Sequence, residues 1–143
     1  MTIAVRYHSR SGNTEKLALA IADEVGVKAE NVSVPLTEKA DVLFLGSALY
    51  AGGVDKAVKK FIAENKDNIG VIYNFGTSAS SSSTYKAVKK LAEANGVALA
   101  EKAYDCRGKF LFMHKGRPND EDCKNAAAFA RDVLVSATEE NTI

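Results

Sequence analysis

Tyr7-His8-Ser9-Arg10-Ser11-Gly12-Asn13-Thr14-Glu15 is the stretch of this sequence that decides the fold, and it lies a few residues from the N-terminus. The apolar segment Ile3-Ala4-Val5 precedes it, and apolar residues at helical spacing follow it, at Leu17, Ala18, Ile21, Ala22 and Val25. This pattern predicts a turn that leads from a buried strand into a helix. Because the first N–H groups of a helix lack partners and the helix dipole is positive there, such a turn is suited to binding an anion.

The composition of this first loop, residues 9–14, fits a phosphate group. Gly12 lets the backbone approach a ligand closely, and side-chain donors come from four residues, Ser9, Ser11, Asn13 and Thr14. Arg10 lies in the same loop, where its guanidinium either adds a contact to the phosphate or points to water. A strand–helix turn without a ligand is the alternative. The nucleotide-binding patterns GxxxxGKS/T and GxGxxG do not fit this loop.

Strand-like and helix-like segments alternate along the rest of the chain. Strands are expected at residues 3–7, 31–34, 41–46, 69–75 and 97–106, and helices at residues 13–25, 54–62, 84–95 and 120–136. Asn119 is the expected cap of the last helix. The alternation predicts a single α/β domain over residues 1–143, with a five-stranded parallel sheet in the order 2-1-3-4-5 and helices on both faces, a three-layer α/β/α arrangement. In such sheets a ligand binds at the carboxyl ends of the strands.

The overall composition excludes several classes of protein. The net charge is only +1, so no strong attraction to nucleic acid or to a membrane surface is expected. Cys106 and Cys123 form no CxxC pair, which argues against a disulfide scaffold. No other metal-type ligand lies near His8 or His114 in the sequence, so we expect no metal site. No signal peptide or bilayer-spanning segment is recognisable, and a cytoplasmic protein is therefore expected.

The second unusual loop follows the third expected strand and reads Gly46-Ser47-Ala48-Leu49-Tyr50-Ala51-Gly52-Gly53. Tyr50 is a large flat ring among small residues, and a planar ring could stack on its face. Gly52 and Gly53 permit backbone angles that other residues avoid. The alternative is that Tyr50 covers the core and that the glycine pair only turns the chain into a helix.

The third unusual loop follows the fourth expected strand and runs from Asn74 to Tyr85. It is rich in hydroxyls and N–H groups, and it includes Gly76, Thr77 and Ser78. In the predicted sheet it lies beside the first two loops. The alternative is a polar loop that ends in a helix cap at Ser83 or Thr84.

These three loops and the strand–helix order resemble the flavodoxins, small electron carriers that bind flavin mononucleotide (FMN). The resemblance covers nearly the whole chain, and its most specific part is the first loop. It implies that the first loop wraps the FMN phosphate and that the other two loops hold the isoalloxazine ring, with Tyr50 against one face. The implied FMN-binding residues are Ser9, Arg10, Ser11, Gly12, Asn13, Thr14, Ser47, Ala48, Leu49, Tyr50, Ala51, Gly52, Gly76, Thr77 and Ser78.

The resemblance implies that the protein shuttles single electrons between redox protein partners, a reductase and an acceptor, as a monomer without catalytic residues of its own. Two alternatives remain: a flavin-dependent quinone or porphyrinogen oxidoreductase on the same fold, and a binding module without flavin. A response regulator is excluded because Leu45-Gly46-Ser47 ends the third strand without a phosphoacceptor Asp. A low-molecular-weight phosphatase is excluded because the first loop has no Cys.

Four features depart from the flavodoxin pattern. Flavodoxins are usually strongly acidic, whereas this chain has a pI of about 7.7. Arg10 lies inside the phosphate loop, and there is no Trp. The segment from Arg107 to Pro118 either folds over the flavin edge, binds a partner, or is a packed connector. As part of the first of these features, the near-neutral charge, the basic pairs Lys59-Lys60 and Lys89-Lys90 are interpreted as solvated helix faces.

Overall fold

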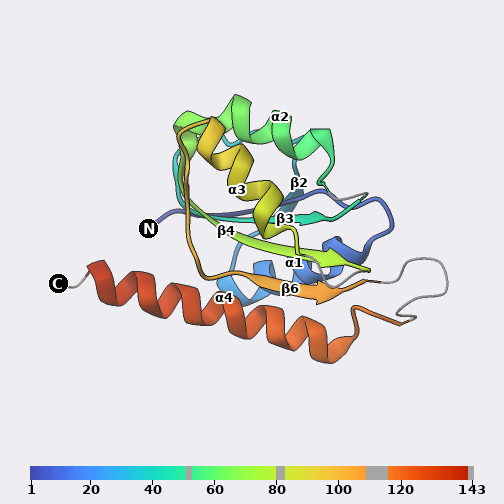
Figure 1. Cartoon of the computed structure of the whole chain (residues 1–143). Coiled ribbons are helices and arrows are strands. Elements are labelled where there is room, and N and C mark those ends of the chain that lie inside the picture. The colour runs from blue at the N-terminus through green and yellow to red at the C-terminus, as the bar shows by residue number, and fades with distance from the viewer. Residues whose placement is uncertain (51–52, 80–82, 109–115, 142–143) are drawn as a thin grey trace.

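A computed structural model describes residues 1–50, 53–79, 83–108 and 116–141 (Figure 1). The strands are β1 (Ile3–Tyr7), β2 (Ala29–Asn31), β3 (Ala40–Ala48), β4 (Ile69–Ser78), β5 (Ala98–Leu99) and β6 (Tyr104–Arg107). The helices are α1 (Asn13–Val25), α2 (Lys56–Asn65), α3 (Tyr85–Ala94) and α4 (Asp120–Asn141), with a short 3-10 turn η1 (Lys66–Asn68) after α2.

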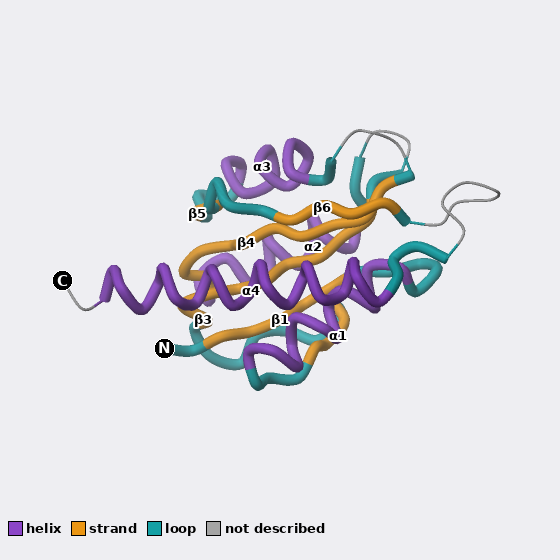
Figure 2. Tube along the Cα trace, turned by 90° about the horizontal axis from the view of Figure 1, so that it is seen from below, coloured by secondary structure: helices purple, strands orange, loops and turns teal. Residues whose placement is uncertain are grey.

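The strands form one parallel sheet in the order β2-β1-β3-β4-β5, and β6 also pairs with β4. Helices α1 and α4 cover one face of the sheet, and α2 and α3 cover the other (Figures 1 and 2). The predicted α/β class, strand order and three-layer arrangement are therefore confirmed. None of the helices in the described ranges is long and apolar enough to cross a membrane.

The sheet's outer edge differs from the single fifth strand expected over residues 97–106. Ile72 of β4 pairs with Leu99 of β5, and Phe75 of β4 pairs with Tyr104 of β6. Between these pairs β4 advances three residues (72 to 75) and its neighbour advances five (99 to 104). The two extra residues loop outward as exposed, charged Glu101 and Lys102, and the strand is split in two.

The second strand also lies earlier than the expected residues 31–34. Residues 29–31 pair with Val5, Arg6 and Tyr7 of β1. Asn31 then ends the strand, because its side-chain oxygen accepts the Ser33 N–H at 2.9 Å and its carbonyl accepts the Val34 N–H at 2.9 Å. Such a side-chain turn competes with the ladder for backbone groups and stops it.

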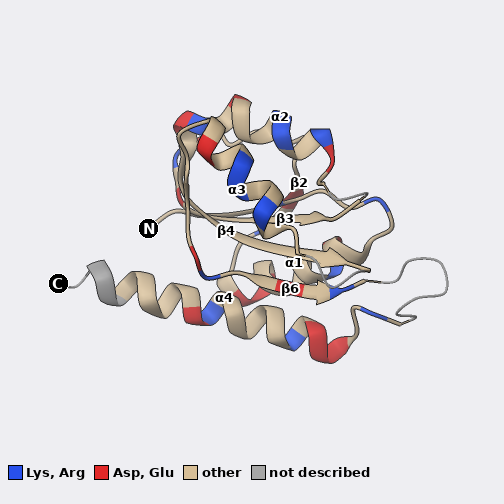
Figure 3. Cartoon of the chain, in the orientation of Figure 1, with Lys and Arg blue, Asp and Glu red and all other residues tan. Residues whose placement is uncertain are grey.

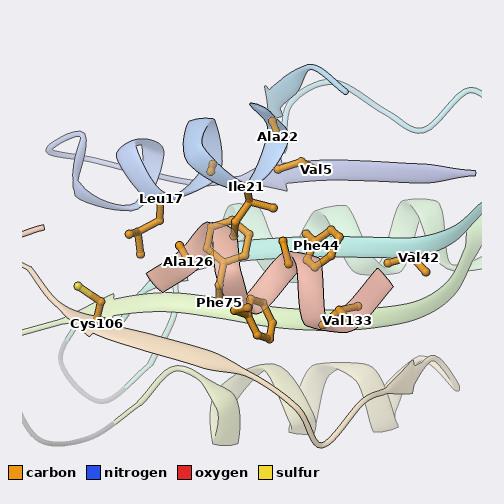
Figure 4. Close-up of a cluster of buried hydrophobic side chains, with 13 residues drawn as sticks. Val5, Leu17, Ile21, Ala22, Val42, Phe44, Phe75, Cys106, Ala126 and Val133 are labelled. Carbon is orange, nitrogen blue, oxygen red and sulfur yellow. The ribbon is translucent and has the colours of Figure 1, made fainter. Parts of the chain in front are cut away.

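Two apolar clusters fill the space between the layers. The cluster under α1 and α4 is shown in Figure 4, where side chains from both helices meet Val5, Phe44 and Phe75 of the sheet. The cluster on the other face joins α2 and α3 to β3 and β4, and includes Leu43, Leu45, Val58, Phe61, Ile62, Ile72 and Val88. Burial on both faces explains why β3 is a continuous apolar run.

Helix α4 begins where the sequence predicted, at a cap formed by Asn119. The Asn119 side-chain oxygen accepts the Asp122 N–H at 2.9 Å, and the Asp122 carboxylate accepts the Asn119 N–H at 2.8 Å. This reciprocal pair satisfies two amides at the helix start. The same carboxylate accepts hydrogen bonds from two nitrogens of the Arg117 guanidinium, Nε at 2.8 Å and Nη2 at 2.7 Å. These bonds connect the helix start to the preceding segment.

Candidate cofactor site

The three unusual loops meet at the carboxyl edge of the sheet. The His8 N–H donates to the Gly46 carbonyl at 3.0 Å, which joins the first loop to β3. The Leu49 N–H donates to the Thr77 carbonyl at 3.0 Å, which joins the second loop to β4. The predicted juxtaposition of the loops is thus what the structure shows, and parallel pairing of β1, β3 and β4 produces it.

The first loop folds tightly onto the start of α1. Gly12 occupies the N-cap position at φ +89°, a left-handed conformation that favours glycine, and its N–H donates to the Ser9 hydroxyl at 3.0 Å. As the N-cap residue, Gly12 supplies no side-chain hydrogen bond to the helix amides. Ser11 is exposed and Asn13 is half-buried at the same helix start. An uncapped helix N-terminus with small polar side chains has the donors that a phosphate requires.

Thr14 lies beneath this loop rather than on it. Its side chain is fully buried and its hydroxyl hydrogen-bonds the Thr77 hydroxyl at 2.8 Å. The pair joins the start of α1 to the end of β4 across 63 residues of sequence. Thr14 therefore positions the first loop against the third, in addition to its predicted place near the phosphate.

The side chain of Arg10 extends away from the first loop and contacts the second. Its Nη2 and Nε donate to the Asp55 carboxylate at 2.7 and 3.2 Å, and its guanidinium carbon lies 4.0 Å from the centroid of the Tyr50 ring. One face of Tyr50 is thus covered by a cation. The Arg10 side chain is nevertheless 57% exposed, and a contact with a phosphate stays a prediction.

Asp55 was not identified from the sequence, although an Asp directly before a helical pattern is a cap signal. Its carboxylate caps α2 by accepting the Ala57 N–H at 2.9 Å. This backbone bond, followed by the bond from Arg10, lowers the pKa of Asp55. The His8 Nε2 also lies 3.8 Å from the same carboxylate, so Asp55 links the first loop to the helix after the second.

The second loop is shorter than expected because β3 extends to Ala48. Ser47 and Ala48 are buried strand residues, whereas Leu49 and Tyr50 are half-buried at the sheet edge. The Tyr50 N–H donates to the Gly53 carbonyl at 2.7 Å, and the Gly53 N–H donates back to the Tyr50 carbonyl at 3.0 Å. The predicted site residues Ala51 and Gly52 lie outside the described residues.

The third loop likewise starts later, because β4 includes Gly76, Thr77 and Ser78 as buried strand residues. Gly76 is required by close packing, since a Cβ there would collide with the Thr84 side chain and lie 3.0 Å from the Ser47 carbonyl oxygen. The first residues of the predicted loop are therefore fixed by the sheet, and they face the second loop through the β3–β4 ladder.

Thr84 occupies the N-cap position of α3, but its hydroxyl does not bind the helix amides. It accepts the Asn74 side-chain N–H at 2.9 Å and donates to the Asp105 carboxylate at 3.3 Å, while the Thr84 N–H also donates to Asp105 at 3.2 Å. Burial raises the pKa of Asp105, and the bonds from Thr84 oppose this effect. No local sequence pattern predicts this triad, because Asn74 lies on β4, Thr84 precedes α3 and Asp105 lies on β6.

Three buried polar atoms have no hydrogen-bond partner among the described residues: His8 Nδ1, Ser47 Oγ and Asn74 Oδ1. Buried polar atoms in folded proteins are nearly always paired. His8 directly follows β1 and Ser47 lies near the end of β3, so both residues are at the sheet edge where the loops meet. Together with the uncapped start of α1, they make a donor set that fits a polar, anionic cofactor such as FMN.

Known proteins resemble this chain in sequence and in fold. An uncharacterised protein of Methanocaldococcus jannaschii is 30% identical, over 85% of this chain and 90% of that protein. A flavodoxin from the domain Archaea has the same fold, with a TM-score of 0.78 at 18% identity, over 96% of this chain and 99% of its own. A flavoprotein from Lactobacillus acidophilus in complex with FMN has a TM-score of 0.56 at 19% identity, over 74% of this chain and 92% of its own.

The flavodoxin domain family matches residues 4–107. This match includes the sequences of all three loops and, apart from Ile3, every strand of the sheet. The chain therefore belongs to the flavodoxin family.

Proposed function

We propose that this protein binds FMN at the carboxyl edge of the sheet and carries single electrons between protein partners. The observation that carries the proposal is the meeting of three loops around the uncapped start of α1, beside the unpartnered atoms His8 Nδ1 and Ser47 Oγ. Membership of the flavodoxin family and the FMN in a structural relative support the choice of cofactor.

The described residues divide into two roles in this proposal. Ser11, Asn13 and the first amides of α1 hold the phosphate, while Thr14 hydrogen-bonds Thr77 and Arg10 hydrogen-bonds Asp55. Tyr50 offers a ring face to the isoalloxazine, and this is the face opposite Arg10. FMN, when bound, supplies one-electron chemistry, and the loops set its environment.

The test is a titration of the purified chain with FMN and with riboflavin, followed by quenching of flavin fluorescence. We expect FMN to bind more tightly than riboflavin, because only FMN has a phosphate for the start of α1. Ser11→Ala is expected to weaken FMN binding by about tenfold, the value of one hydrogen bond to a charged group, and to leave riboflavin binding unchanged. Ser136→Ala, at an exposed serine in the C-terminal half of α4, is the matched control.

Absence of binding at tens of micromolar FMN would reject the proposal and favour a binding module without flavin. A second measurement separates a carrier from an enzyme. Stepwise reduction of the loaded protein is expected to proceed through two one-electron stages, and the protein is expected not to turn over quinones with a reductant. Sustained quinone turnover would favour the oxidoreductase instead.

A further inference from the structure

A groove of about 420 Å³ lies between α2 and α3, on the face of the sheet opposite α1 and α4. Four lysines line it, two from each helix: Lys56, Lys59, Lys86 and Lys90. The apolar side chains of Val54 and Leu91 line it as well. An apolar surface within a charged rim is the usual composition of a protein–protein interface.

The positive charge of this groove is not neutralised within the described part of the chain. Lys60 and Lys89 are exposed on the same helices, which brings the number of lysines on α2 and α3 to six. None of the six forms an ion pair with a described residue. Residues 51–52, 80–82, 109–115 and 142–143 contain no Asp or Glu side chain. Figure 3 shows the lysines on both helices.

The acidic residues nearest in sequence do not cancel this charge. Asp55, at the start of α2, is bound to Arg10. Glu64 and Glu93 lie toward the C-terminal ends of α2 and α3. The helix dipoles add to the positive potential, because the lysines lie mainly on the N-terminal halves of the two helices.

The groove adjoins the candidate cofactor site. Gly53 lines the groove, and its N–H and carbonyl both hydrogen-bond Tyr50, at 3.0 and 2.7 Å. A molecule seated between α2 and α3 therefore lies beside the second loop. Electron transfer between two proteins requires their cofactors to come close, so this position is suitable for a redox partner.

We infer that the lysine groove docks the acidic face of a redox partner protein, an inference that rests on the proposed electron-carrier function. Complementary charge would speed the encounter and fix the orientation of the partner, and the apolar residues Val54 and Leu91 would stabilise the docked complex. The sign of the groove is the reverse of the acidic surface that the flavodoxin resemblance implies, so the partner's face has the reverse sign too.

The test is an NMR titration of the isotope-labelled full chain with an acidic haem protein, cytochrome b5, and with a basic one, cytochrome c. We expect cytochrome b5 to shift the amide signals of residues 54–60 and 86–91, and cytochrome c to leave them unchanged. Lys59→Glu/Lys90→Glu is expected to weaken the binding of cytochrome b5 at least tenfold, and high salt is expected to weaken it as well.

The matched control is Lys39→Glu/Lys124→Glu, which makes the same change in net charge at two exposed lysines away from α2 and α3. Its affinity for cytochrome b5 is expected to stay within about twofold of the unmodified chain's. Equal losses in the two double variants, or shifts confined to other surfaces, would overturn the inference.

The titration is performed without and then with FMN, which separates the two proposals. A chain that binds cytochrome b5 through the groove but never binds FMN supports the docking surface and rejects the proposed cofactor function. A chain that binds FMN but shows no groove-specific binding of cytochrome b5 retains the function and overturns the docking inference.

Discussion

The hydroxyls of Thr14 and Thr77 hydrogen-bond each other at 2.8 Å, and both side chains are buried. Thr14 lies at the start of α1, beneath the first loop. Thr77 lies at the end of β4, where the third loop begins. The contact therefore holds two of the three loops in register before any ligand binds. Such preorganisation reduces the conformational cost of binding a cofactor.

The Thr14–Thr77 pair is expected to contribute to stability as a unit. Thr14→Val or Thr77→Val leaves one buried hydroxyl without its partner and is expected to lower the free energy of unfolding by about 1–3 kcal/mol. The double variant, which removes both hydroxyls, is expected to cost less than the sum of the single changes. Urea denaturation of the four proteins measures this, and simple additivity would show that the pair is not coupled.

Tyr50 is predicted to bind the flavin ring through its face rather than through its hydroxyl. Tyr50→Phe is expected to retain FMN affinity within about twofold, whereas Tyr50→Ser is expected to lose about tenfold and to leave the flavin fluorescence less quenched. Tyr104→Phe, which alters a tyrosine packed against Phe129, is the control. Equal affinities for Tyr50→Phe and Tyr50→Ser would show that the ring does not stack on the flavin.

Asp105 is expected to make stability fall as the pH rises. Burial raises its pKa in the folded chain above the ordinary value of 3.8, so the folded state binds more protons than the unfolded state. Stability is then highest below about pH 4 for this group, and it declines as the pH rises through the folded pKa.

Asp105→Asn is therefore expected to raise the free energy of unfolding at pH 7 and to remove that decline, because the amide oxygen still accepts the Thr84 N–H. Asp67→Asn, at an exposed position, is the control. The measurement is urea denaturation from pH 3 to 8. A less stable Asp105→Asn protein at pH 7 would mean that the bonds to the charged carboxylate outweigh its burial.

Cys106 is expected to be unreactive in the folded protein. Burial raises the pKa of its thiol from 9.0 to about 11, so the reactive thiolate is about a hundredfold scarcer at pH 8 than for an ordinary thiol. Cys123 is only half-buried. With Ellman's reagent, the thiol of the Cys106→Ser variant is expected to react much faster than that of the Cys123→Ser variant. Similar rates would show that Cys106 is accessible.

The local pattern of the sequence determined much of the fold. Apolar spacing located all four helices and the strands β1, β3 and β4, and Asn119 correctly predicted the start of α4. These features depend on residues close together in the chain, because backbone propensity and the spacing of buried side chains both operate over a few residues. The family predicted from the same signals is confirmed by the match to the flavodoxin domain, whereas the FMN-binding residues stay a prediction.

The tertiary structure alone decided which side chains meet at the candidate site. Arg10 pairs with Asp55 across 45 residues, and Thr14 pairs with Thr77 across 63. The break between β5 and β6 likewise follows from how Leu99 and Tyr104 pair with β4. A sequence gives the polarity and spacing of such groups, but only the register of the sheet and the packing of the helices bring distant ones within hydrogen-bonding distance.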